Sequence, residues 1–163
     1  MSDTNLHTFN LEIDSTGQYK SEVTVDIDGE VRNTSHPDIG ADEFDIRALA
    51  GVYTIGGSSP DYEDFTSAVE DMRLYGVQDP VTFNVEAGTY SEQVKISGIN
   101  RMSEQDSITF RSSGGDSTQV VLQYEATHED SNYVLRLEQE DYITFRGMTL
   151  KATGADYGRV VDL

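Results

Sequence analysis

The sequence predicts an all-β chain that winds as a solenoid. Residues 81–96 hold two short alternating apolar stretches on either side of one glycine-centred corner, and units of this kind recur as far as residue 163. Only one convincing helix lies between them and the N-terminal part. A chain that keeps making short strands and corners winds around one interior, so stacked coils are expected. An antiparallel sandwich of short strands is the alternative.

A repeated tetrapeptide supports the winding. Ile-Thr-Phe-Arg occurs at residues 108–111 and again at residues 143–146, and Val81-Thr82-Phe83 is a looser third copy. The copies begin 27 and 35 positions apart. Coils of about 20–30 residues with occasional loop insertions produce such uneven spacing.

The first 45 residues alternate in two places. The stretches Leu6–Ile13 and Val23–Ile27 have a period of two, which predicts half-buried strands. Asp28-Gly29 is typical of a hairpin turn. An irregular acidic stretch follows at residues 36–44, so we expect a module boundary near residues 44–49.

One helix is expected, near residues 61–75. It has an apolar stripe at i, i+3, i+4 and i+7, formed by Phe65, Ala68, Val69 and Met72. Asp61 is expected to cap its N-terminus, with Glu63 and Asp64 in its first turn, and Gly76 is expected to end it. The helix should cover the open end of the sheet that follows, because an uncovered edge invites aggregation.

Only strands are expected after residue 80. Together with a short strand at residues 52–55 before the helix, they lie at residues 81–85, 93–96, 107–111, 119–124, 133–137, 142–145, 148–151 and 159–163.

Composition excludes several classes of function. Thirty acidic residues against eleven basic ones give a formal net charge of −19. This charge repels a nucleic-acid backbone and disfavours an anionic membrane surface. No apolar run approaches the ~20 residues that span a bilayer. Cysteine is absent, which excludes disulfides and thiolate zinc sites. We therefore expect no nucleic-acid partner and no membrane insertion.

Residues 88–94, Gly-Thr-Tyr-Ser-Glu-Gln-Val, resemble the Gly-x-Tyr-x-Glu-x-Val corner near the start of pectin-methylesterase-type β-helices. The preceding helix, Pro80 and the strand Val81–Val85 also fit the start of that fold. Residues 141–150 look like a generic coil of secreted bacterial repeat proteins. The resemblance implies a right-handed parallel β-helix of the pectin-lyase-like type, in a large bacterial protein that is extracellular or at the cell surface.

A second resemblance concerns the order of the modules. Residues 26–32 and 37–44 resemble the closing segment of such β-helices, in which an Asp-x-Asp-Gly-x-x-Arg turn precedes a Pro-x-x-Gly-Ala-x-Glu end. A closing segment followed by an opening segment implies a junction of tandem modules. Residues 1–45 would close a preceding β-helical module. Residues 46–163 would supply the capping helix and first coils of a second one, truncated at its C-terminus and without a signal peptide.

Three carboxylates form the candidate metal site. Asp26, Asp28 and Glu30 alternate with apolar residues beside a glycine turn, and oxygen ligands of this kind suit Ca²⁺. The full EF-hand spacing is missing. The alternative is a solvated strand face that ends in an Asp-Gly turn. Calcium is the only cofactor that the sequence suggests.

No catalytic residue is predicted. The resemblance implies catalytic aspartates and an arginine on later coils, and no matching motif follows residue 94. Asp141 and Arg146 flank a strand at an odd separation, which places them on opposite faces. Glu92 is expected to hold the corner through hydrogen bonds. The Gly/Ser-rich residues 112–117 are interpreted as a solenoid loop, because no lysine or helix follows them.

The sequence therefore predicts a structural or adhesive β-helix module with a rigid acidic surface, which can bind carbohydrate. Its tyrosines are expected to pack at corners, with stacking on sugar rings as the alternative. One alternative function is the N-terminal part of a polysaccharide-active esterase, lyase or hydrolase, with its catalytic coils outside this chain. Another is a filament module that assembles end to end through its terminal coil. The expected partners are accordingly a polysaccharide or a second copy.

Overall fold

The computed structural model describes residues 13, 15–43, 48–100 and 102–163. The chain divides into two compact units between residues 47 and 48. The second unit contains all the named strands and helices within the described residues. None of the helices in the described part is long and apolar enough to span a membrane.

The second unit has ten strands, one α-helix and one short 3₁₀ helix among its described residues. In chain order they are β1 (Leu49–Ile55), α1 (Phe65–Tyr75), β2 (Val77–Val85), β3 (Gly88–Ser91), β4 (Val94–Ser97), β5 (Ile108–Ser112), β6 (Val120–Tyr124), η1 (Glu129–Ser131), β7 (Leu135–Glu138), β8 (Ile143–Arg146), β9 (Thr149–Ala152) and β10 (Val161–Asp162).

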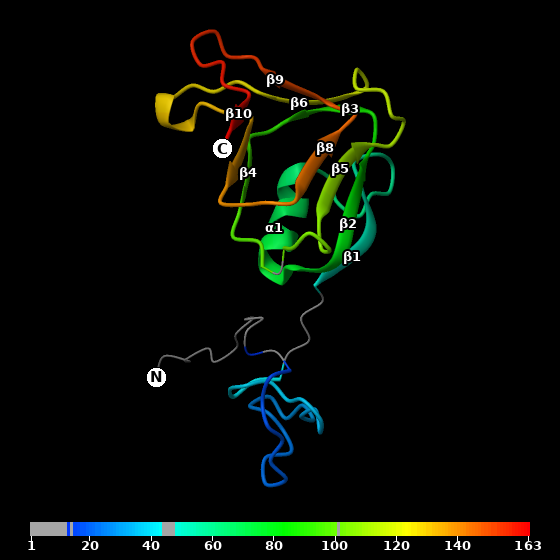
Figure 1. The fold of residues 1–163 in the computed structure, drawn as a ribbon, viewed down its shortest axis with the longest axis vertical. Coiled ribbons are helices and arrows are strands. Elements are labelled where there is room, and N and C mark those ends of the chain that lie inside the picture. Colours follow the sequence, from blue (N-terminus) through cyan, green and yellow to red (C-terminus); the bar gives the residue numbers. More distant parts are fainter. Residues whose placement is uncertain (1–12, 14, 44–47, 101) are drawn as a thin grey trace. The chain divides into compact units, whose positions relative to one another are not determined.

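The strands form three parallel sheets. Their orders are β1-β2-β5-β8, β3-β6-β9 and β4-β7-β10, and every pairing within them is parallel. Consecutive strands from β2 onward enter different sheets, and every third strand returns to the same sheet. The backbone therefore winds in three coils, β2-β3-β4, β5-β6-β7 and β8-β9-β10, whose sheets form three sides in Figure 1. The predicted parallel β-helix is confirmed, and the antiparallel sandwich is wrong.

The tetrapeptide repeat sets the register between coils. Val81 pairs with Ile108 and Ile108 pairs with Ile143, so the three copies align residue by residue. Two residues connect β2 to β3, whereas seven connect β5 to β6, and the connection from β6 to β7 is also longer than that from β3 to β4. The uneven spacing of the copies therefore arises in the corners, and the stacked strands keep their alignment.

A column of phenylalanine rings occupies the interior. The rings of Phe83 and Phe110 lie 4.8 Å apart, and those of Phe110 and Phe145 lie 4.8 Å apart at an interplanar angle of 8°. Phe83 and Phe110 are fully buried. Phe145 and Ile143 of the third coil are only partly buried. Inward-facing apolar residues on successive coils thus provide one continuous core.

Helix α1 closes the interior at the first coil. Its buried residues are the predicted stripe Phe65, Ala68, Val69 and Met72, and the helix contacts β1 and β4. Gly76 ends it as predicted, with a φ of 70° and its N–H donating to the carbonyl of Met72 at 2.8 Å. The prediction that this helix caps the fold is confirmed.

The start of the helix differs from the prediction. Asp64 is the N-cap, and its carboxylate accepts the N–H of Ser67 at 2.8 Å. Asp61 instead accepts the backbone N–H and the hydroxyl of Thr54, both at 2.8 Å. Glu63 and Asp64 therefore precede the first turn. Either aspartate is a suitable N-cap residue. The carboxylate of Asp61 is occupied by Thr54 of β1, and Asp64 caps the helix.

Strand β3 differs from the prediction, which makes Gly88–Ser91 part of a corner. The segment has only partly buried and exposed residues, and its pairing with β6 comes from the backbone. Sequence periodicity reports side-chain burial, so a short strand without a buried residue leaves little signal.

The described part of the first unit, residues 13 and 15–43, contains no strand. Its one β-bridge is antiparallel and joins Val25 to Val31. Val25 and Ile27 are 45% and 50% exposed, so the predicted half-buried strand at residues 23–27 is wrong. The buried side chains here include charged ones, namely Asp26, Arg32, Asp38 and Asp42. Most of the stretch Leu6–Ile13 lies outside the described residues.

Candidate functional site

The outer face of the sheet β1-β2-β5-β8 carries two rows of polar side chains. In each copy of the repeat the apolar residues are directed inward, so the residues between them are directed outward. Pairing aligns one row of threonines from β2, β5 and β8 (Thr82, Thr109 and Thr144). It aligns a second row of Asn84, Arg111 and Arg146. Repetition of one short motif thus places two arginines side by side.

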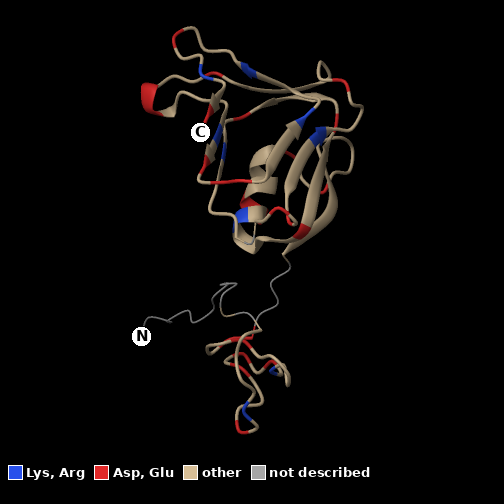
Figure 2. Cartoon of the chain, in the orientation of Figure 1, with Lys and Arg blue, Asp and Glu red and all other residues tan. Residues whose placement is uncertain are grey.

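A hollow of about 500 Å³ lies at the end of these strands. Its size is in the range of ligand-binding clefts. We call it the arginine hollow, and it is lined by Asn84, Arg111, Ser112, Ser113, Gly114, Gly115, Arg146 and Gly147. Figure 2 shows Lys/Arg colouring at the ends of both β5 and β8. The Gly/Ser-rich loop that the sequence indicates as a plain solenoid corner thus forms one wall of the hollow.

Hydrogen bonding fixes one of the two guanidinium groups. The Nε–H of Arg111 donates to Oδ1 of Asn84 at 2.8 Å, across neighbouring strands. Within the part of the chain that the structure describes, the Nη groups of Arg111 and the whole guanidinium of Arg146 have no protein acceptor or ion-pair partner. Both side chains are exposed. The hollow therefore offers several unused hydrogen-bond donors.

The lining of the hollow contains no carboxylate and no histidine. Asp116 follows the loop, but its carboxylate accepts the N–H and hydroxyl of Thr118 at 2.9 and 2.7 Å. These hydrogen bonds lower the pKa of Asp116. Asp141, the partner considered for Arg146, is not among the lining residues. The hollow thus has donors for binding but no acid, base or activated nucleophile.

Glu92 has a structural role, as predicted, although it acts on the helix. Its carboxylate accepts the N–H groups of Phe65 and Thr66 at 3.1 and 2.9 Å, and the Thr66 hydroxyl at 2.6 Å. These are otherwise unpaired donors of the first turn of α1. The corner therefore holds the capping helix on the first coil through a charged group near the positive end of the helix dipole.

Tyr90 belongs to the same corner. Its hydroxyl donates to the carbonyl of Glu86 at 2.9 Å and lies 3.2 Å from the carbonyl of Ile55. Its ring packs edge-on against Phe65 at 5.3 Å. Gly56 has a φ of 72°, and a side chain there would collide with the Tyr90 hydroxyl. Tyr90 thus packs at a corner, as predicted for the tyrosines. The Gly-x-Tyr-x-Glu-x-Val pattern joins β1, α1 and the first coil.

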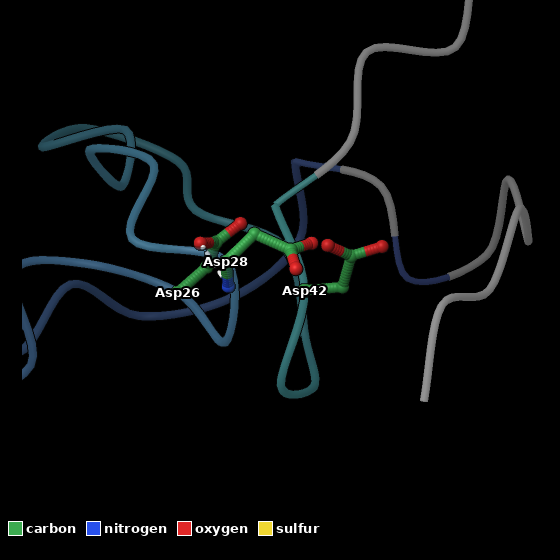
Figure 3. A group of neighbouring side chains, drawn as sticks. All are labelled: Asp26, Asp28 and Asp42. Carbon is green, nitrogen blue, oxygen red and sulfur yellow. Dashed lines mark hydrogen bonds between the residues drawn. The ribbon is translucent and has the colours of Figure 1, made fainter. Parts of the chain in front are cut away.

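The first unit brings together an acidic cluster of Asp26, Asp28 and Asp42, shown in Figure 3. One carboxylate oxygen from each lies within 4.8 Å of the others. Glu30, the third predicted ligand, is not in this group, and its backbone N–H donates to Asp26 at 2.8 Å. Sequence reasoning missed Asp42, since it lies fourteen positions beyond Asp28 in an irregular stretch.

The carboxylate of Asp26 organises the surrounding backbone. It accepts the N–H groups of Asp28, Glu30 and Glu43 at 2.9, 2.8 and 3.1 Å. Burial opposes ionisation of Asp26, but these hydrogen bonds outweigh it and lower its pKa. This arrangement gives Asp26 a structural role, whether or not a cation binds. Calcium binding by the cluster stays a prediction.

Arg32, which is buried, and the partly buried Glu43 form a second contact in this unit, with a guanidinium–carboxylate distance of 3.4 Å. Arg32 also donates to the carbonyls of Asp38 and Gly40 at 3.1 and 2.7 Å. Charged residues of the segments 26–32 and 37–43 therefore contact one another and form the polar interior of the unit.

Comparisons with known proteins support the fold. No protein-family model matches this chain, and no curated protein matches it. Among solved structures it is similar to two crystal structures of the pectin methylesterase from Aspergillus niger, in deglycosylated and penultimately deglycosylated forms. The TM-scores are 0.50 and 0.51, and the sequence identities are 15% and 16%.

Each match covers 71% of this chain and 40% of the enzyme chain, so the similarity spans less than half of that protein. At such low identity the likeness shows the fold alone, which is a right-handed parallel β-helix.

Proposed function

We propose that this chain is a structural and adhesive module, which presents a carbohydrate-binding face on a rigid β-helix in a larger extracellular protein. The stacked coils support this proposal, because parallel pairing through three sheets fixes the outer side chains in rows. Rigid elements hold binding groups more accurately than free loops do. Residues 1–45 would close one β-helical module, and residues 46–163 would begin the next.

The observation that carries the proposal is the lining of the arginine hollow. Arginine, asparagine and serine side chains supply hydrogen-bond donors for hydroxyl, ring and acid oxygens of a saccharide. Glycoside hydrolysis commonly needs a pair of carboxyl groups, and covalent ester hydrolysis needs a nucleophile with a base. Neither arrangement lines the hollow. Binding without turnover is the function that this chemistry favours.

The alternative is an enzyme whose catalytic coils lie outside this chain. The fold similarity to a pectin methylesterase favours it, since this chain matches only part of that protein. In that case the coils described here would begin a longer substrate groove.

Affinity electrophoresis through gels that contain single polysaccharides tests the proposal. The panel would include neutral glucans and mannans, methyl-esterified and de-esterified pectins, and sulfated polymers, with heat-denatured chain as the control. We expect retardation by at least one polymer. Parallel assays for methanol release, new reducing ends and unsaturated products should stay at background. No retardation by any polymer would contradict an adhesive role, and turnover of a polymer would favour the enzyme.

A further inference from the structure

We infer that the arginine hollow binds the oxyanion of an acidic saccharide, a carboxylate or a sulfate ester, through Arg111 and Arg146 acting together. This inference rests on the proposed carbohydrate-binding function and names its ligand class. It follows from the register of β5 and β8, from the absence of an acidic partner in the lining of the hollow, and from the shape of the neighbouring loop.

The register places the two guanidinium groups within reach of one ligand group. Arg111 and Arg146 pair directly across neighbouring parallel strands, which lie about 4.8 Å apart. Asn84 holds the Nε of Arg111, so the two Nη groups remain for a ligand. A planar guanidinium matches the two oxygens of a carboxylate or sulfate, and such charge-assisted hydrogen bonds are the strong ones. One oxyanion between the two arginines can accept from both.

Two other cations on the solenoid contact acidic residues. On the sheet β4-β7-β10, Lys95 contacts Glu138 at 2.7 Å, and Arg136 contacts Asp162 at 2.6 Å. Each of these pairs joins neighbouring coils. Arg111 and Arg146 face each other instead, although acidic residues outnumber basic ones by 30 to 11. Like charges directly opposite each other destabilise a sheet, so an anionic ligand would relieve a repulsion that the protein leaves uncompensated.

The strongly negative net charge does not prevent this binding. At physiological ionic strength charges are screened over about 8 Å. The potential at the hollow therefore depends mainly on nearby charges. The lining holds two arginines and no acid, and Asp116 directly follows the lining residue Gly115. Distant carboxylates would instead slow the approach of an anionic polymer, and added salt would reduce that effect.

The loop after β5 gives the hollow an accessible wall. Gly115 has a φ of 72°, and a β-carbon placed on it or on Gly114 would meet no atom within 4 Å. A saccharide can therefore approach the backbone closely at these two positions. The threonine row beside the arginines extends the polar face across the coils. A saccharide chain that crosses the strands would meet hydroxyl groups next to the arginines.

Isothermal titration calorimetry with oligosaccharides of matched length tests the inference. The probes are an oligogalacturonate, its methyl ester, a sulfated oligosaccharide and a neutral cello-oligosaccharide. We expect the acidic or the sulfated probe to bind the intact 163-residue chain, and the methyl ester and neutral probes to bind at least about tenfold more weakly. Arg146→Gln and Arg111→Gln should each weaken the binding roughly tenfold. The affinity of Arg146→Lys should lie between those of the unmodified chain and Arg146→Gln, because lysine keeps the charge but lacks the planar guanidinium.

Lys151→Gln is the matched control. Lys151 is exposed on β9 in the same coil as Arg146, so the variant has the same net charge as Arg146→Gln. It should bind as the unmodified chain does, and circular dichroism should show that every variant is folded. Equal weakening by Lys151→Gln would reduce the effect to net charge and overturn the inference.

The outcomes separate this inference from the function on which it rests. Strong binding of neutral saccharides, unaffected by the arginine variants, would leave an adhesive module and reject the oxyanion site. If both arginine variants bind an acidic probe as strongly as the unmodified chain does, the oxyanion site is likewise rejected and the adhesive function is kept. Failure of every saccharide to bind would reject the adhesive function together with the inference.

Discussion

Several carboxylates in this protein accept hydrogen bonds that hold separate segments of the chain together. Glu92 lies between β3 and β4, yet its carboxylate holds the first two residues of α1. Asp61 holds Thr54 of β1, and Asp26 holds three backbone amides of the first unit. Each of these carboxylates serves the fold, so a count of acidic residues overstates the number that are available for chemistry.

Glu92→Gln should destabilise the second unit by about 1–2 kcal/mol, since it removes the charge and one of the two acceptor oxygens at the helix N-terminus. Urea unfolding followed by circular dichroism measures the loss. Glu125→Gln is the control, because the Glu125 side chain is exposed and makes no hydrogen bond or ion pair within the described part of the chain. Equal midpoints for both variants would mean that the contacts of Glu92 contribute little.

The stability of the first unit should depend on the ionisation of Asp26. Its pKa is lower in the folded state than the usual value of about 3.9. Its contribution is therefore complete above that value and is lost as the pH falls through the lower, folded pKa. The amide resonances of Glu30 and Glu43 should shift together in ¹⁵N NMR, with a midpoint below about 4. Asp26→Asn should abolish this transition, while Glu22→Gln should leave it in place.

Calcium remains to be tested at the same cluster. A bound ion raises the melting temperature by mass action, and three neighbouring carboxylates are suitable oxygen ligands. If calcium binds, Asp42→Asn should remove the rise in melting temperature and Glu30→Gln should preserve it. Asp42 belongs to the group of three carboxylates, and Glu30 does not. A melting temperature that is unchanged at millimolar calcium contradicts the prediction.

At the scale of elements, the first coil is closed by α1 and the second is enclosed by its neighbours. Phe110 stacks between Phe83 and Phe145. Because nothing in the described chain packs on its far side, the third coil keeps its apolar residues only partly buried. The contribution of equivalent phenylalanines should therefore differ along the column.

Phe110→Ala should cost about 3–5 kcal/mol, the usual loss for a buried phenylalanine. Phe145→Ala should cost roughly half as much, since part of its surface is already hydrated. Urea unfolding of both variants, with the slope of the transition checked for two-state behaviour, gives the comparison. Equal losses would contradict the view that the third coil is less enclosed than the second.

Most elements can be predicted from the sequence for a physical reason. Alternating apolar residues identify strands that bury one face, and the copies of Ile-Thr-Phe-Arg show which strands are equivalent. Strand β3 lacks buried residues and leaves no such signal. The choice between Asp61 and Asp64 as helix cap depends on Thr54, which is a tertiary contact. The sequence also does not indicate that Asp42 joins Asp26 and Asp28, because it lies fourteen positions beyond Asp28. The arginine hollow requires the register, because only pairing brings Arg111 beside Arg146.

At the scale of the whole chain, the last strand of each sheet is one place where further pairing can occur. In the described residues β8, β9 and β10 each lie at one end of their sheet order. Exposed strand edges favour pairing with other chains. Strand addition here is what the end-to-end alternative requires.

That alternative predicts a molar mass that rises with protein concentration in static light scattering. A mass that stays at the 18.1 kDa of the single chain across the accessible range would reject it. Val161→Lys, at an exposed residue of β10, should lower any association, because charged residues discourage edge pairing. Association that is insensitive to this change would point to another surface.

The corner between β5 and β6 holds seven residues where the coil before it uses two, and the strands on either side remain aligned. Such a corner accepts extra residues without disturbing the neighbouring coils. Longer peptides grafted at residues 113–119 should therefore leave the β-helix unchanged. Changes at this one bend would alter the wall of the arginine hollow while the stacked coils stay constant.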